Sequence, residues 1–108
     1  MTTPINILAD LPIALPEELF ETLLRGSSFR VERIVSRGHH SPDGFWYDQP
    51  QHEWVLLLAG AARLTCDGEE SIDLRPGMVL NIPARRRHRV EWTDPETDTV
   101  WLAIHYDD

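Results

Sequence analysis

Short apolar runs separated by turn residues dominate the sequence from residue 29 to residue 106. The run Val55–Ala59 is closed by Gly60, and the dipeptides Asp67-Gly68 and Pro76-Gly77 separate later runs. Asp-Gly is a strong hairpin signal, and proline followed by glycine favours a tight turn. Roughly eight or nine short strands at such spacing are typical of an all-β sandwich or barrel.

The N-terminal part of the chain follows a different pattern. Residues 1–15 are expected to form an extended arm. Pro16 suits the first turn of a helix, and the two glutamates after it would lie where the helix dipole favours negative charge. Leucine and phenylalanine then recur at helical spacing up to Gly26. The sequence therefore predicts one short helix over residues 16–26, followed by a β-barrel over residues 29–106.

Composition indicates a single ordinary globular domain over residues 1–108. The formal net charge of −8 disfavours nucleic-acid binding. The single cysteine, Cys66, cannot form an internal disulfide, which suits a reducing compartment. No apolar run is long enough to span a membrane, and the N-terminus lacks the basic-then-apolar pattern of a signal peptide. We therefore expect a cytoplasmic protein that binds neither nucleic acid nor membrane.

Two motifs in the strand-rich region resemble those of the cupin superfamily. In the first, Glu53 is followed by six residues and then by Gly60. In the second, Gly77 is followed by five residues and Pro83, and four further residues precede His88. The chain is thus similar to a small single-domain cupin. This resemblance implies a double-stranded β-helix, or jelly-roll, for the barrel.

The first motif departs from the family pattern where metal ligands are expected. Family members normally carry two histidines before the glutamate, and Tyr47 and Gln49 stand in their places. Of the four usual ligands, Glu53 and His88 remain. The resemblance implies a divalent-metal site at the barrel mouth, formed here by Gln49, Glu53 and His88, for an ion such as Zn, Mn, Fe or Ni. Neutral oxygen atoms are weak ligands for zinc and iron, so we expect weak binding.

The expected ligand pocket draws on both motifs and on the last strand. Trp92, which replaces the asparagine usual in the second motif, shares a strand face with His88 and should form part of the wall. His105 could face the cavity or the outside, whereas strand alternation sends His52 to the opposite face from Glu53. The candidate pocket comprises Tyr47, Gln49, Glu53, His88, Trp92 and His105. Within it, His88 is the best candidate for a catalytic group.

The second motif also carries an arginine-rich segment, Arg85–Arg89, around His88. Its first residue, Arg85, stands where the family usually has glycine. Such a segment could attract an anionic substrate. Alternatively, its arginines pair with the many surface acids of this chain, which is the interpretation we prefer.

Three functions are compatible with these residues. The expected one is a small-molecule-binding barrel of unassigned substrate, with a weak divalent-metal site at its mouth. The alternatives are a metal-dependent enzyme of the oxygenase or isomerase type, and a metal-free enzyme that uses His88 as its acid–base group together with Tyr47. The missing histidines weigh against the metal enzyme. We also expect a homodimer in which the arm, residues 1–15, covers a sheet edge of the second copy.

Overall fold

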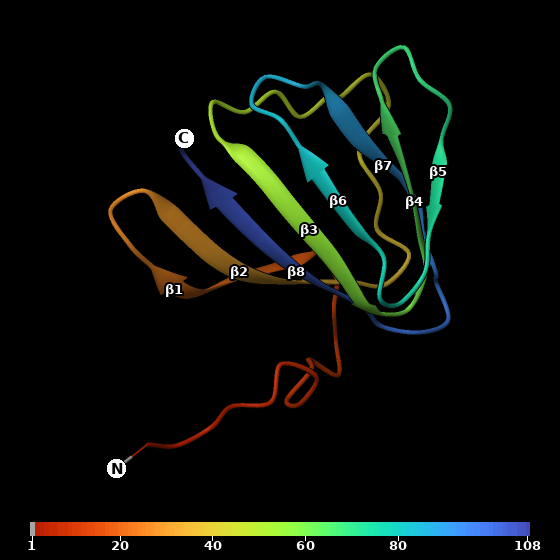
Figure 1. Ribbon diagram of the computed structural model, residues 1–108. Coiled ribbons are helices and arrows are strands. Elements are labelled where there is room, and N and C mark those ends of the chain that lie inside the picture. The colour runs from red at the N-terminus through yellow and green to blue at the C-terminus, as the bar shows by residue number, and fades with distance from the viewer. Residues whose placement is uncertain (1) are drawn as a thin grey trace.

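The computed structural model describes residues 2–108, which form eight strands in two antiparallel sheets (Figure 1). The five-stranded sheet has the order β1-β2-β8-β3-β6, and the three-stranded sheet has the order β5-β4-β7. The strands are β1 (Leu19–Arg25), β2 (Phe29–Ser36), β3 (His52–Ala59), β4 (Ala62–Cys66), β5 (Ile72–Leu74), β6 (Val79–Ile82), β7 (His88–Thr93) and β8 (Thr99–Tyr106). The all-β jelly-roll prediction is confirmed.

The predicted helix over residues 16–26 is wrong. Leu19–Arg25 forms β1, which pairs antiparallel with β2 at the edge of the larger sheet. Its side chains are alternately half-buried and exposed, which is the period of a strand. The apolar residues of this segment suit either period, and local propensity is a weak prior. Pairing with β2 satisfies the backbone of β1 and therefore decides its structure.

The hydrophobic core lies between the two sheets, which face each other in Figure 1. Strand alternation sends every second side chain of each strand into this layer. The buried core residues come from six strands: Ile34, Val55, Leu57, Ala62, Leu64, Leu74, Ile82, Trp101 and Ala103. Both sheets thus contribute apolar side chains to one core, as in other sandwiches and barrels.

The N-terminal arm lies outside both sheets and is held by arginines of β2 and the residue after it. Arg33 Nη1 donates hydrogen bonds to the carbonyl oxygens of Ile7 and Ala9 at 2.9 and 2.8 Å. Arg37 donates in the same way to the carbonyls of Pro12 and Ile13, both at 3.0 Å. The arm is therefore tied to its own sheet by side-chain-to-backbone hydrogen bonds.

Residues 2–108 contain no helix, and so none that is long and apolar enough to cross a membrane. The cytoplasmic location stays a prediction from the sequence.

Gly60 closes the turn between β3 and β4 in a conformation that other residues rarely adopt. Its φ is 85°. A Cβ atom at this position would lie 2.6 Å from the Cα of Thr99 and 2.8 Å from the carbonyl oxygen of Asp98. Both the positive φ and the close approach of β8 require glycine here. The turn joins the two sheets, since β3 and β4 belong to different ones.

Candidate functional site

A cavity of about 60 Å³ lies between the two sheets. Its lining combines convergent polar groups with an apolar wall, a combination typical of small-molecule sites. The polar lining residues are Glu18, Glu32, Tyr47, Gln49, Glu53, His88 and His105. The apolar lining residues are Phe20, Ile34, Val55, Leu64, Val90 and Trp101.

Two glutamates and two histidines alternate across this cavity. His105 Nε2 on β8 donates to Glu32 Oε1 on β2 at 3.0 Å. Glu53 on β3 is the direct cross-strand neighbour of His105, so both project from the same face of the sheet. From the opposite sheet, His88 Nε2 on β7 lies 3.4 Å from Glu53 Oε1. All four residues are buried, and the row of carboxylate and imidazole groups connects the two sheets.

Glu53 carries an unsatisfied buried oxygen atom. Its Oε1 accepts no hydrogen bond from any group within residues 2–108, although His88 Nε2 lies within ion-pair distance. That separation of 3.4 Å is longer than an ordinary nitrogen-to-oxygen hydrogen bond. Leaving a buried acceptor without a partner costs roughly 1–3 kcal/mol, and more for a charged group. Such a group in a cavity wall is placed to receive a donor from a ligand or a water molecule.

The hydrogen bonds of His88 fix which of its nitrogens faces the cavity. Nδ1 lies 2.9 Å from the carbonyl oxygen of Arg86, and since a carbonyl can only accept, Nδ1 carries the proton. Nε2 therefore faces Glu53. Burial by itself lowers the pKa of His88, but the Glu53 carboxylate and the Arg86 carbonyl outweigh it, so the pKa is raised. The Glu53 carboxylate therefore favours the protonated form of the His88 imidazole.

Burial and hydrogen-bond partners also shift the pKa values of Glu32 and Glu18, the other acids of the cavity. Burial works to raise the pKa of Glu32, but the hydrogen bond from His105 and the charges of His105 and Arg30 lower it overall. Burial raises the pKa of Glu18, and the hydrogen bond from the Ser36 hydroxyl only partly opposes this. Glu32 is thus kept ionised, whereas Glu18 holds its proton more readily.

Tyr47 provides a neutral hydroxyl group in this acidic surrounding. Burial, followed by the charges of Glu18, Glu53 and Glu32, raises its pKa to about 12. Its ring stacks on the imidazole of His88, with centroids 5.3 Å apart and planes 23° apart. The phenol therefore remains protonated near neutral pH and can donate a hydrogen bond.

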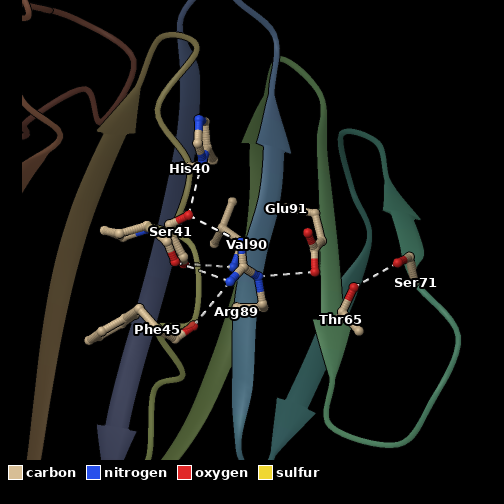
Figure 2. A network of polar contacts seen from close by, with 9 residues as sticks. His40, Ser41, Phe45, Thr65, Ser71, Arg89, Val90 and Glu91 are labelled. Carbon is tan, nitrogen blue, oxygen red and sulfur yellow. Dashed lines mark hydrogen bonds and ion pairs between the residues drawn. The ribbon is translucent and has the colours of Figure 1, made fainter.

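The segment that carries Tyr47 is attached to β7 by backbone and side-chain hydrogen bonds. Tyr47 and His88 exchange backbone hydrogen bonds of 2.7 and 3.1 Å. Arg89 reaches across to the same segment and donates to the carbonyls of Ser41 and Phe45 at 3.2 and 3.4 Å (Figure 2). The Ser41 hydroxyl also accepts from the backbone of β7 at Val90. These contacts hold the Tyr47 side of the cavity against His88.

The structure brings together all the predicted pocket residues except Trp92. A β-bulge in β7 explains the exception: Leu64 pairs with Val90 but Arg63 pairs with Trp92, which leaves Glu91 as the extra residue. Because side chains alternate between faces, one extra residue turns the following ones over. Trp92 therefore points outward and is 40% exposed, while Thr93 is buried in its place.

The structure also shows which way His105 and His52 point. His105 lines the cavity and bonds Glu32. His52 faces away from it, where its Nδ1 accepts from the backbone nitrogen of Ala84 at 2.9 Å and its Nε2 pairs with Asp108 at 2.8 Å. Only His105 therefore belongs to the candidate site.

Glu18 and Glu32 were missed by the sequence analysis. Glu18 fell within the segment expected to be helical. Glu32 shares a strand face with Ile34, but the opposite face carries Val31 and Val35 and is the more apolar of the two. No local signal shows that the Glu32 face is the inner one, because the arm covers the other face only in the folded protein.

The cavity residues do not fit a tight metal site. Within residues 2–108, no group of three or more His, Cys, Asp or Glu side chains is placed to hold a metal ion. At the positions that correspond to the family's ligands, Glu53 and His88 stand with the neutral oxygens of Gln49 and Tyr47, while Glu32 and His105 are bonded to each other. A protonated phenol and an amide are poor ligands for zinc or iron. We therefore derive no chemistry that depends on a bound metal.

The arginine-rich segment pairs with surface acids, as the preferred interpretation predicted. None of its arginines is a lining residue of the cavity. The pairs are Arg85–Asp48 at 3.5 Å, Arg86–Glu69, Arg87–Asp67 at 3.2 Å and Arg89–Glu91 at 3.0 Å. This segment therefore adds no free positive charge to the site.

The jelly-roll and the cavity between its sheets define a cupin barrel, and the comparison with known families agrees. The family described as "Cupin domain" matches residues 31–105. The chain therefore belongs to the cupin family. No curated protein matches the chain.

Several solved structures are similar to this chain over most of its length. A proposed mannose-6-phosphate isomerase from Ralstonia eutropha JMP134 is 46% identical, with a TM-score of 0.95 over 99% of this chain and 100% of that one. A cupin superfamily protein from Desulfitobacterium hafniense DCB-2 is 21% identical, with a TM-score of 0.74 over 91% and 84%. A DMSP lyase from Ruegeria pomeroyi DSS-3 is 21% identical, with a TM-score of 0.65 over 77% and 40%. The last two similarities show the fold alone.

Proposed function

We propose that this cupin binds a small molecule in the cavity between its sheets, and that Glu53 and His88 contact it. The observation that carries the proposal is Glu53, a residue of the cavity wall whose buried Oε1 atom has no hydrogen bond within the described residues. Native proteins satisfy nearly all buried polar groups, so an orphaned acceptor in a cavity wall calls for a partner. A bound donor would relieve this cost.

The cavity limits the size of that molecule. A volume of about 60 Å³ accommodates a group of a few non-hydrogen atoms or a small cluster of waters. The apolar wall, which includes Val55 and Trp101, favours a carbon-bearing group over a fully hydrated ion. A larger ligand would place only its head group inside.

A fragment titration followed by NMR tests this proposal. The fragments would be small amines, alcohols, carboxylates and hydroxy ketones, and the imidazole signals of His88 and His105 would report binding in the cavity. We expect fragments to shift these two signals and not that of His40, which lies in an exposed loop. A Glu53→Gln variant should weaken the response. If no fragment shifts either cavity imidazole, the proposal is wrong.

The pairing of Glu53 with His88 favours proton transfer as a second function, without a metal. The pKa of His88 is raised above its ordinary value, because the Glu53 carboxylate and the Arg86 carbonyl outweigh burial, and a positioned imidazole can give or take a proton in catalysis. Tyr47 adds a protonated hydroxyl group that could stabilise a developing negative charge. The Ralstonia protein carries the name of an isomerase, and isomerases of hydroxy carbonyl compounds move protons between neighbouring atoms.

Deuterium exchange tests the second function. Small hydroxy ketones incubated with the protein in heavy water should lose the proton next to the carbonyl group faster than without protein. His88→Gln should abolish the acceleration, whereas His40→Gln should leave it unchanged. Exchange that is equally fast with both variants would exclude His88 as the acid–base group.

A further inference from the structure

We propose that the cavity selects ligands with a small organic cation, such as an ammonium head group, and rejects ligands that carry phosphate. This inference rests on the proposed ligand-binding function and adds the charge class of the ligand. It comes from the charges of the lining, the unsatisfied Glu53 and the aromatic walls.

The lining has an excess of acids over bases. Three carboxylates, those of Glu18, Glu32 and Glu53, face two imidazoles, those of His88 and His105. No lysine or arginine is among the residues found to line the cavity in the described part of the chain. With both imidazoles protonated, Glu32 and Glu53 are balanced and Glu18 has no imidazole partner. Burial raises the pKa of Glu18, so Glu18 adds its negative charge once it ionises, and the local field then disfavours an anion.

The basic groups near the cavity are already engaged. Arg30 Nε lies 3.5 Å from Glu32 Oε2, and His105 bonds the other oxygen of the same carboxylate. His88 uses Nδ1 for the Arg86 carbonyl and turns Nε2 toward Glu53. A phosphate group would have to break one of these pairs and would still meet carboxylates. Burying such an uncompensated charge is strongly unfavourable.

Glu53 provides an observation that points independently to a cation. Only 9% of the residue is exposed, and its Oε1 lacks a hydrogen-bond partner within residues 2–108. His88 Nε2 lies at ion-pair distance from Oε1 but makes no hydrogen bond to it, and a cationic group near this carboxylate would pair with it in a site of low dielectric, where charge pairing is stronger than in water. A neutral hydroxyl could also donate to it, but it would leave the excess of acids uncompensated.

Aromatic side chains complete a lining suited to an organic cation. Phe20, Tyr47 and Trp101 come from three different segments and all line the cavity. Aromatic faces attract alkylammonium groups through the ring quadrupole, and several rings around one site are the usual solution for quaternary ammonium recognition. Acidic groups and aromatic rings therefore favour the same class of head group.

The proposal predicts that this chain does not bind mannose 6-phosphate, the substrate named for the Ralstonia protein. Mannose 6-phosphate carries a phosphate dianion. In the present cavity that dianion would face Glu18, Glu32 and Glu53 with no free basic side chain. A shared fold does not imply a shared ligand, because ligand choice depends on the site.

A calorimetric titration with matched probes tests the charge preference at constant ionic strength. The probes are choline, the alcohol in which a carbon atom replaces the choline nitrogen, and inorganic phosphate. We expect choline to bind roughly tenfold more tightly than its uncharged isostere and phosphate to give no heat. Glu18→Gln should weaken choline binding several-fold. The matched control is Glu17→Gln, which removes the same charge from an exposed neighbouring position and should change nothing.

The outcomes distinguish this inference from the proposed function. If the uncharged isostere binds as tightly as choline, or if phosphate binds, the charge preference is wrong while the cavity remains a ligand site. The same holds if fragments of other classes shift the cavity imidazoles but choline does not. An equal effect of Glu17→Gln and Glu18→Gln would show that choline binds through the general negative charge of the protein. That result would also overturn the inference.

Discussion

At the scale of single residues, the cavity depends on charges that the fold places next to one another without fully satisfying them. Glu32 and His105 form a well-aligned pair at 3.0 Å, whereas Glu53 and His88 stand 3.4 Å apart with one oxygen unbonded. The first pair supports the structure of the cavity wall. The second pair remains available to a ligand, which is why we assign it the central role.

The raised pKa of His88 predicts how stability changes with pH. The folded state prefers the protonated imidazole, because its pKa in the folded protein lies above the ordinary value of 6.5. The stabilising contribution is therefore fully present below about pH 6.5 and is lost as the pH rises through the folded pKa. Urea denaturation at a series of pH values should show the free energy of unfolding falling over this window. His88→Gln should flatten the profile, and His40→Gln should not. An unchanged profile in His88→Gln would assign the slope to another group.

The mixed donors of the cavity predict weak metal binding. Glu53 and His88 provide one carboxylate and one imidazole, and Gln49 and Tyr47 provide neutral oxygens. Calorimetric titration with zinc, manganese, iron(II) and nickel should give low affinity that decreases as the pH drops through the histidine range. His88→Ala should abolish the binding, Glu53→Gln should weaken it, and the metal-free protein should be folded. Equal binding by wild type and His88→Ala would show that His88 is not a ligand.

At the scale of elements, two strand features decide which side chains reach the cavity. The pairing of β1 with β2 brings Glu18 and Phe20 to the cavity wall. The helix expected over the same residues would not have this strand pairing. The bulge in β7 keeps His88 and Val90 facing inward but turns Trp92 outward. Both features depend on partners that lie far away in the sequence.

The turn residues Gly60 and Arg85 predict responses of different size to substitution. Gly60→Ala places a Cβ against Thr99 Cα in a left-handed conformation, so we expect a loss of at least about 2 kcal/mol in the free energy of unfolding. Arg85 already has a φ of 65° at the position where cupins usually carry glycine. Arg85→Gly relieves this strain but increases the freedom of the unfolded chain, and its exposed pair with Asp48 contributes little. We expect a change smaller than about 1 kcal/mol. Urea denaturation measures both, and an equal loss in the two variants would contradict the argument.

At the scale of the whole molecule, exposed apolar residues favour association into the homodimer that we propose. Ile5, Leu8 and Ile13 of the arm are 74%, 48% and 96% exposed, although the arm is tied to the sheet through the carbonyl oxygens of Ile7, Ala9, Pro12 and Ile13. The edge strand β1 adds Phe20 and Leu24, which are 51% and 58% exposed. Exposed apolar side chains and an open sheet edge are features that a second copy could cover.

Deletion of residues 1–12 tests this association. Light scattering should give twice the chain mass of 12.4 kDa for the whole protein, and the deleted protein should be a monomer or precipitate. Ile13→Asp keeps the arm and should weaken the dimer without unfolding the chain, because Ile13 makes no core contact. A monomer mass before and after deletion would refute the proposed dimer.

The sequence by itself determined the strand-rich class, the family and five of the polar residues that line the cavity. Turn dipeptides and short apolar runs are local signals, and they predicted the succession of short strands that the structure shows within residues 29–106. The spacing of Glu53, Gly60, Pro83 and His88 identified the cupin barrel and, with it, two groups that face each other across the cavity.

Tertiary structure decided the remaining features. The strand state of Leu19–Arg25, the inward face of Glu32 and the outward turn of Trp92 each depend on which strand or segment lies alongside. The physical reason is that successive side chains of a strand point to opposite faces, and this alternation is the same whichever face is buried. A single bulge exchanges the two faces for the residues that follow it. Only long-range pairing selects the face, so Glu18 and Glu32 were recognised as cavity residues only in the folded chain.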